Sequence, residues 1–278
     1  MNATDSYMME NFEESIRLEI KTDPAAVLEQ ARWCGLKPGM RVLDAGCGPG
    51  KVTSILKELI QPHGEITGVD YSSERVEYAR EHYGRGEGID FKVHDLRQPL
   101  EDMGKFDLVW VRFVLEYNLA ESEEIVKSLK SCLKPGGYLC LLDLDLNCLN
   151  HYQVPLKMEE VLFSLMDKLE KEHNFDPYAG RKLYAYMYDH DFEEIEMDLV
   201  PHHLFYGNNI RKEDLFNWIK KVEVASTKAS EIFDAYDGGH KAFFEDFNSF
   251  FMDARRFTYT PLIICKGAKP FSDGEDQE

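Results

Sequence analysis

The sequence predicts an α/β protein with a doubly wound, mostly parallel seven-stranded sheet, an antiparallel late strand, and a helical cap or insertion. Three observations lead to this prediction. From Arg41 to about Asp143, short β-branched runs alternate with stretches of helical periodicity. The first run ends in the glycine-rich turn "GCGPG". After Asp145 the rhythm changes to longer amphipathic stretches that are rich in Met and aromatic residues, which is typical of helices.

The first half of the chain contains five predicted strands and three crossover helices. The strands are expected at "RVLDA", "EITGVD", "IDFKVH", "FDLVWV" and "GYLCLLD". The helices are expected at "KVTSILKELI", at "SERVEYAREHY", which Ser72 or Ser73 can cap, and at "ESEEIVKSLKSCL". The turn "LKPGG" ends the third helix and leads into the fifth strand.

The second half contains two further predicted strands between helical segments. They are "EEIEMDLVPHH" and "RFTYTPLIICKG", and the second can pair with the first in antiparallel fashion. We therefore expect an N-terminal helical lid at residues 1–35, a core at 36–145 and 178–268, cap segments at 146–177 and 210–253, and an acidic tail at 269–278.

Composition limits the possible partners. The 278 residues carry a net charge of -19, which disfavours nucleic acid and anionic membrane surfaces, because both need clustered Lys and Arg. The six cysteines form no C-x-x-C pair, so we expect no metal site.

The acidic N-terminal segment lacks the basic start of a signal peptide, and no apolar run reaches the ~20 residues of a spanning helix. These features predict a cytoplasmic protein without membrane insertion, and they leave the oligomeric state undetermined.

The glycine turn predicts a nucleoside cofactor at the carboxyl edge of the sheet. Gly46, Gly48 and Gly50 expose backbone N–H groups where a strand leads into a helix. The dinucleotide fingerprint requires Gly or Ala where Lys51 stands, and the Gly-Lys-Ser/Thr ending of a P-loop is absent. An adenosine without a pyrophosphate fits better. Asp44 can meet an ammonium group directly or through water, so these features describe S-adenosylmethionine.

The second strand supports this interpretation. It ends in Asp70, whose carboxylate can accept both ribose hydroxyls. With these motifs in order, the chain resembles the Rossmann-like class I S-adenosylmethionine-dependent methyltransferases, especially the branch with small-molecule and quinone-biosynthesis enzymes. The resemblance covers roughly residues 36–143 and includes "VLDAGCGPG", "ITGVD", "HDL", "FDLVWVRFVLEY" and "LKPGGYL".

The resemblance implies a set of site residues. Asp95 takes the position that usually reaches the adenine amino group, and the end of the fourth strand lies beside the methionine part of the cofactor. An N-terminal helix in related chains covers the cofactor, and an Arg such as Arg17 can meet the methionine carboxylate. The cofactor-binding residues expected here are Arg17, Asp44, Gly46, Cys47, Gly48, Gly50, Asp70, Tyr71, His94, Asp95, Leu96 and Arg112.

The expected activity is transfer of a methyl group to an O, N or C nucleophile of a small-molecule acceptor. Displacement at a sulfonium needs positioning and a dry site more than a fixed catalytic constellation. A base is useful for a hydroxyl or protonated amine, and Glu116 and Tyr117 are the candidates; His151, His190, His202 and His203 are alternatives. Two other functions stay open: an enzyme that modifies the cofactor itself, and a non-catalytic module that binds the cofactor or a partner.

Overall fold

The computed structural model of the chain describes residues 18, 19, 21–147, 149–208 and 210–271. Most of the predicted N-terminal helix therefore lies outside the described residues, and so does Arg17. Within the described part, no helix combines the length and apolar character needed to cross a bilayer.

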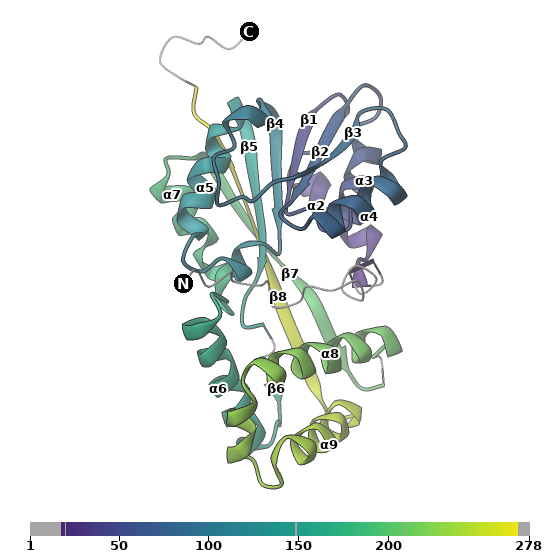
Figure 1. The fold of residues 1–278 in the computed structure, drawn as a ribbon, viewed down its shortest axis with the longest axis vertical. Coiled ribbons are helices and arrows are strands. Elements are labelled where there is room, and N and C mark those ends of the chain that lie inside the picture. Colours follow the sequence, from purple (N-terminus) through teal and green to yellow (C-terminus); the bar gives the residue numbers. More distant parts are fainter. Residues whose placement is uncertain (1–17, 20, 148, 209, 272–278) are drawn as a thin grey trace.

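Within the described residues the sheet has eight strands, in the order β3-β2-β1-β4-β5-β8-β6, with β7 paired to β8 (Figure 1). The strands are β1 (Arg41–Ala45), β2 (Glu65–Asp70), β3 (Ile89–Val93), β4 (Phe106–Arg112), β5 (Leu133–Leu144), β6 (His151–Tyr152), β7 (Glu193–Tyr206) and β8 (Phe257–Ala268). The first five are parallel, and β8 is antiparallel to β5, β6 and β7. The predicted fold class is confirmed. The additional strand β6 has two residues, too few to show a period of two in the sequence.

The helices include the three crossover helices that the sequence predicts for the first half of the chain. The described helices are α2 (Pro24–Trp33), α3 (Lys51–Leu59), α4 (Ser73–Tyr83), α5 (Ser122–Ser131), α6 (Leu156–Glu172), α7 (Leu183–Asp189), α8 (Lys212–Lys228) and α9 (Gly239–Met252). Single turns of 3₁₀-helix occur at η1 (Glu101–Met103), η2 (Leu115–Tyr117), η3 (Ala179–Lys182) and η4 (Ser230–Ala235). As expected, Ser72 caps α4, where its hydroxyl accepts a hydrogen bond from the Arg75 N–H at 3.4 Å.

Helices cover both faces of the sheet, so its central strands are buried on both sides. Val42 and Leu43 are consecutive in β1 and fully buried; Val42 packs with α2 and α3, and Leu43 packs with α5 and α7. This two-sided burial explains why β1 has a continuous apolar run instead of alternating polarity.

A separate hydrophobic cluster joins helices from the second half of the chain. Side chains from α6, α8, η4 and α9 pack around buried Trp218 and Phe247. In Figure 1 the paired strands β7 and β8 extend beyond the parallel strands and reach α8 and α9. The division into core and cap that the sequence predicts stays a prediction.

The segment after β8 differs from the predicted tail. Lys269 exchanges two backbone hydrogen bonds with the "PGG" turn before β5, of 2.9 Å from the Gly136 N–H and 2.8 Å to the Gly137 carbonyl. The first residues of the predicted tail are therefore attached to the sheet, because their backbone groups find partners in that turn.

Candidate cofactor and acceptor site

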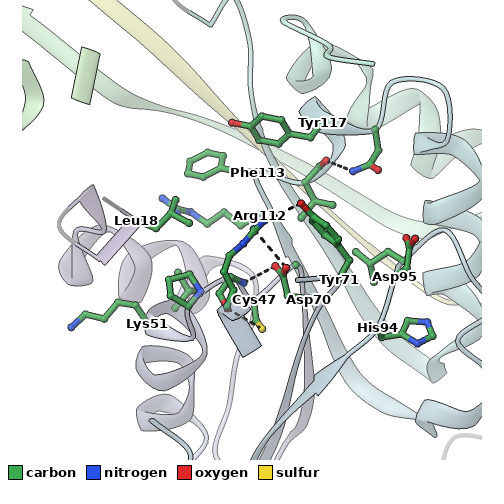
Figure 2. Close-up of a pocket in the computed structure, with 18 of the residues that line it drawn as sticks. Leu18, Cys47, Lys51, Asp70, Tyr71, His94, Asp95, Arg112, Phe113 and Tyr117 are labelled. Atoms are coloured by element: carbon green, nitrogen blue, oxygen red, sulfur yellow. Dashed lines mark hydrogen bonds and ion pairs between the residues drawn. The ribbon is translucent and has the colours of Figure 1, made fainter. Parts of the chain in front are cut away.

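A cavity lies at the carboxyl ends of β1, β2 and β4, where ligands bind in open α/β sheets. Figure 2 shows His94 and Asp95 on one side of Asp70, with Phe113 and Tyr117 on the other. Of the cofactor-binding residues that the sequence predicts, the following line the cavity: Gly46, Cys47, Gly48, Asp70, Tyr71, His94, Asp95, Leu96 and Arg112.

The three glycines of the turn have different surroundings. A Cβ atom on Gly46 would overlap Val114, and one on Gly50 would lie 2.7 Å from the Ala79 Cβ, so both positions are closed by the protein itself. Among the described residues, a Cβ on Gly48 would meet only Leu18, at 3.7 Å. Gly48 is therefore the glycine whose free side faces the cavity, whereas Gly50 does not line it.

Asp70 is fixed by the turn that it faces. Its carboxylate accepts hydrogen bonds of 3.0 Å from the Gly48 N–H and 3.0 Å from the Ser72 N–H, and Arg75 Nη1 lies 3.6 Å away. An ionised carboxylate has about four lone-pair sites, so Asp70 can accept further donors besides these two N–H groups. This is the arrangement that a pair of ribose hydroxyls requires.

The wall beyond Asp70 is formed by the segment after β3. Asp95 is bound by Arg97 in bidentate fashion, with N–O distances of 2.9 and 2.8 Å, and this interaction lowers the pKa of Asp95. The His94 Nε2 is buried without a hydrogen-bond partner among the described residues. Tyr71 and Leu96 add an aromatic ring and an aliphatic side chain. A flat heterocycle with polar edges, such as adenine, fits these groups.

Asp44, which was expected to meet an ammonium group directly or through water, does not line the cavity. It is 2% exposed, and its Oδ2 accepts a hydrogen bond of 2.6 Å from the Thr53 hydroxyl of α3. Burial raises the pKa of Asp44 to about 7, although the Thr53 hydrogen bond and the Arg112 charge act in the opposite direction. Asp44 therefore lies behind the glycine turn, so a direct contact with a bound ammonium group is not supported.

Arg112 and Phe113 lie at the end of β4. The Arg112 guanidinium carbon lies 4.1 Å from the centre of the Phe113 ring, and the Arg112 Nε is buried without a hydrogen-bond partner among the described residues. Desolvation lowers the pKa of Arg112 to about 10, and the nearby Asp44 and Asp143 charges oppose this shift. Phe113 has a positive φ of 59°, which is uncommon for a residue other than glycine and reverses the chain at the edge of the cavity.

The two candidate bases are placed differently. Tyr117 lines the cavity, whereas Glu116 does not and is 2% exposed. Glu116 accepts a hydrogen bond of 3.0 Å from the Asn147 side chain, and burial raises its pKa. Because the turn η2 directs Glu116 toward Asn147 and away from the cavity, a direct contact between Glu116 and an acceptor is not supported.

The four alternative histidines do not line the cavity either. His151 bonds to the Thr258 hydroxyl at 2.9 Å and packs against Trp218, as a structural histidine would. His202 packs edge-on to Phe113 with ring centres 5.0 Å apart, and burial holds its pKa well below the usual range. The histidine that lines the cavity besides His94 is His173, at the end of α6.

Sequence reasoning missed several residues of the wall. They are Leu18, Lys21, Thr22, Pro49, Lys51, Val52, Arg75, Arg97, Phe113, Val114, Asn118, His173 and Asn174. From the long segment after β5, residues 146–252, only His173 and Asn174 are among the described residues that reach the cavity. Asn174 is held there by its side-chain oxygen, which accepts a 2.8 Å hydrogen bond from the Ala120 N–H. The positive φ of 53° at Asn174 has no sequence signal beyond the tolerance of Asn for this conformation.

The parallel sheet, the open glycine turn and the acidic end of β2 define an α/β protein with a nucleoside-cofactor site. The chain belongs to a methyltransferase family, because the sequence model described as "Methyltransferase domain" matches residues 36–198, more than half of its length. The resemblance to the S-adenosylmethionine-dependent methyltransferases, with this compound as the family's cofactor, is thereby confirmed.

Relatives and solved structures agree with this assignment. A demethylmenaquinone methyltransferase of Staphylococcus aureus is 33% identical over 110 residues, which are 39% of this chain and 45% of the relative. The chain thus spans less than half the length of that curated relative. Phosphoethanolamine N-methyltransferase 2 of Haemonchus contortus, solved with phosphomonomethylethanolamine and S-adenosylhomocysteine, has a TM-score of 0.58 at 17% identity, over 93% of this chain and 57% of the other. An S-adenosylmethionine-dependent methyltransferase of Aquifex aeolicus has a TM-score of 0.50 at 16% identity, over 92% and 98%.

Proposed function

We propose that this protein transfers a methyl group from S-adenosylmethionine to a small-molecule acceptor by in-line displacement. The observation that carries the proposal is the convergence of Gly48, Asp70 and Asp95 on one cavity at the sheet's carboxyl edge. The named relatives carry the names of small molecules of unlike chemistry, demethylmenaquinone and phosphoethanolamine, which supports a small-molecule acceptor without identifying it.

The residues fit the cofactor at distinct positions. Asp70 would accept the ribose hydroxyls, Asp95 and the unpartnered His94 Nε2 would meet the edges of the adenine, and the bare side of Gly48 would let the amino-acid part approach the backbone. When bound, S-adenosylmethionine supplies an electrophilic methyl group on a sulfonium with a neutral leaving group. Asp44 would act only indirectly, through the Thr53-supported base of the turn.

The chain's own contribution to the reaction is positioning and exclusion of water. Phe113, Val114 and Tyr117 give the cavity an apolar wall beyond the glycine turn. A dry wall strengthens the electrostatic interactions inside it and holds reacting groups at contact distance. Tyr117 lines the cavity and Glu116 does not. Tyr117 is therefore the candidate whose hydroxyl can exchange a proton with an acceptor.

A thermal melt tests the cofactor, and product analysis tests the reaction. S-adenosylmethionine and S-adenosylhomocysteine should both raise the melting temperature by mass action, whereas NAD should not. Incubation with cofactor labelled in the methyl group then separates three outcomes. Label in an acceptor supports a methyltransferase, label in an altered cofactor supports the cofactor-modifying alternative, and binding without turnover supports a non-catalytic module. A shift with NAD alone would refute all three.

A further inference from the structure

Three nitrogen-bearing side chains surround Phe113 at the end of the cavity away from Asp95. Lys21 Nζ lies 5.0 Å from the centre of the Phe113 ring, the Arg112 guanidinium carbon 4.1 Å from it, and the His202 ring centre 5.0 Å. Lys21, Arg112 and Phe113 line the cavity, and His202 supports Phe113 from behind. We refer to Lys21, Arg112, Phe113 and His202 as the Phe113 cluster.

Two buried nitrogens of this cluster lack a hydrogen-bond partner among the described residues. They are the Nε of Arg112 and the Nε2 of His202. The Arg112 Nε always carries a hydrogen, so it is a donor without an acceptor. Native proteins rarely leave such a donor buried and unmatched, and an unmatched group beside a cavity indicates a ligand that satisfies it.

The buried carboxyl groups near Arg112 do not fill this role. Each lies outside the cavity wall and accepts hydrogen bonds from other groups: Asp44 from Thr53, Glu116 from Asn147, and Asp143 from the backbone N–H groups of Leu115 and Glu116. Among the described residues, the donor of Arg112 is therefore left for an acceptor inside the cavity.

The charge of the cavity wall is opposite to that of the whole chain. Its described residues include five cationic side chains and two carboxylates: Lys21, Lys51, Arg75, Arg97 and Arg112, against Asp70 and Asp95. S-adenosylmethionine would add a sulfonium, an ammonium and one carboxylate, so it brings one more positive charge to a wall that already has an excess of three. Part of this excess is balanced from outside the wall, because Lys51 lies 3.9 Å from Glu19 and the charges of Asp44 and Asp143 act on Arg112. An anionic acceptor would bring the loaded cavity closer to neutrality than a neutral acceptor would.

We infer that the methyl acceptor is an aromatic acid whose carboxylate binds Arg112 and Lys21 beside Phe113. The inference rests on the proposed methyltransferase function. The planar fork of a guanidinium matches a carboxylate in bidentate geometry, and the ammonium of Lys21 adds a second charge. The rings of Phe113 and Tyr117, both in the wall, would flank the aromatic part of the acceptor.

Matched pairs of acids and amides test this inference without knowledge of the natural acceptor. The protein, saturated with S-adenosylhomocysteine, is titrated calorimetrically with benzoate and benzamide, 4-hydroxybenzoate and 4-hydroxybenzamide, and phenylacetate and phenylacetamide. Each pair has the same shape and differs in charge. We expect the acid of at least one pair to bind with a Kd at least tenfold below that of its amide.

Two cavity variants and one control assign the preference to the cluster. In Arg112→Gln the ratio of amide Kd to acid Kd should fall by tenfold or more. This fold-change should be larger than the fold-change in affinity for S-adenosylhomocysteine. Lys21→Met keeps the aliphatic stem and should reduce the same ratio. This variant provides the test if Arg112→Gln does not fold. Arg211→Gln removes an exposed positive charge, which pairs with Asp214 outside the cavity wall, and should leave the ratio unchanged.

The results separate this inference from the function on which it rests. If wild-type protein fails to bind S-adenosylhomocysteine, the proposed function falls, and this inference falls with it. If it binds S-adenosylhomocysteine but no acid is preferred over its amide, only the anionic acceptor is refuted. If Arg112→Gln loses S-adenosylhomocysteine affinity and keeps the acid preference, the cluster holds the cofactor's own carboxylate and the inference is wrong.

Discussion

In the glycine turn and at the strand ends, some residues serve packing and others face the cavity. Gly46 and Gly50 are closed by Val114 and Ala79, so their lack of a side chain serves packing. Gly48 and Asp70 face the cavity and are joined by a 3.0 Å hydrogen bond. The three glycines look equivalent in the sequence, and the structure shows that the free side of Gly48 is the one open to the cavity.

A first prediction follows for Gly48. It has a φ of 54°, and Gly39, in the turn before β1, has a φ of 84° with open space for at least 4 Å around the position that a Cβ would take. Ala at either site should cost roughly 1–2 kcal/mol of unfolding free energy, because both residues lie in the left-handed region. Only Gly48→Ala should also weaken S-adenosylhomocysteine binding, by tenfold or more in calorimetry. Equal affinities of the two variants would show that the turn faces something else.

Asp70 carries a second prediction. Gly48 N–H bonds to Oδ2 of Asp70 and Ser72 N–H to Oδ1, so Asp70→Asn keeps an oxygen for one of the two N–H groups. It also loses the charge that strengthens hydrogen bonds from a ribose. We expect a loss of about 1.5–3 kcal/mol in binding of S-adenosylhomocysteine, the range for hydrogen bonds to a charged group. Asp90→Asn, at an exposed position on β3, is the control. Wild-type affinity in Asp70→Asn would contradict the ribose assignment.

A third prediction concerns pH and Asp44. Its pKa is about 7 in the folded protein against 3.8 for the free side chain, so the folded state binds the proton more tightly. The contribution of Asp44 to stability is therefore most favourable below pH 4 and is lost as pH rises to about 7. At ~1.4 kcal/mol per pKa unit, the full loss is about 4 kcal/mol.

Comparison with Asp44→Asn isolates this effect. The amide oxygen can still accept the Thr53 hydrogen bond, and the group cannot ionise. The unfolding free energy of Asp44→Asn, minus that of the wild type, should increase between pH 4.5 and pH 8 in urea titrations, where ~2–3 kcal/mol of the loss falls. If the difference is constant over that range, Asp44 does not titrate there.

Elements differ in how far the sequence determines them. The strands β1 to β5 and the helices between them could be predicted because each is a short buried run or an amphipathic stretch bounded by glycine or a cap. The strand β6, the direction of Glu116 and the arrival of His173 at the cavity could not. They depend on single backbone turns, such as the positive φ of Phe113, which local propensity does not specify.

The helices α8 and α9 allow a fourth prediction, because no described residue of either lines the cavity. Phe247 of α9 is fully buried among the aromatic side chains of its cluster. Phe247→Ala should lower the unfolding free energy by about 3–5 kcal/mol, the usual cost of removing a buried ring. Affinity for S-adenosylhomocysteine should stay within about twofold of wild type, because cluster and cavity are built from different elements.

Phe216→Ala, at an exposed position of α8, provides the matched control and should change stability far less. A large loss of cofactor affinity in a folded Phe247→Ala protein would show that the helices and the cavity are coupled. The predicted division of the chain into a core and a separate cap would then be wrong.

The whole molecule combines a strongly acidic surface with a basic cavity. The net charge of -19 is spread over 278 residues, whereas the cavity wall has more cationic side chains than carboxylates. Long-range fields are screened beyond a Debye length of about 8 Å at physiological salt, so a small ligand inside the cavity experiences mainly the local charges. A large polyanion on the surface experiences the field of the whole chain.

This contrast gives the last prediction, in which the direction of the salt dependence is decisive. Proteins that bind nucleic acid through Lys and Arg release counterions, so their affinity rises steeply as salt is lowered. For this chain, lower salt extends the repulsion between its acidic surface and phosphates, so a duplex DNA of ~30 base pairs or a transfer RNA should bind neither at about 150 mM nor at about 20 mM salt. Fluorescence anisotropy with labelled nucleic acid at both salt concentrations provides the measurement. Binding that appears at the lower concentration and weakens as salt is added would reveal a basic surface able to overcome a net charge of -19, and the exclusion of nucleic acid as a partner would be wrong.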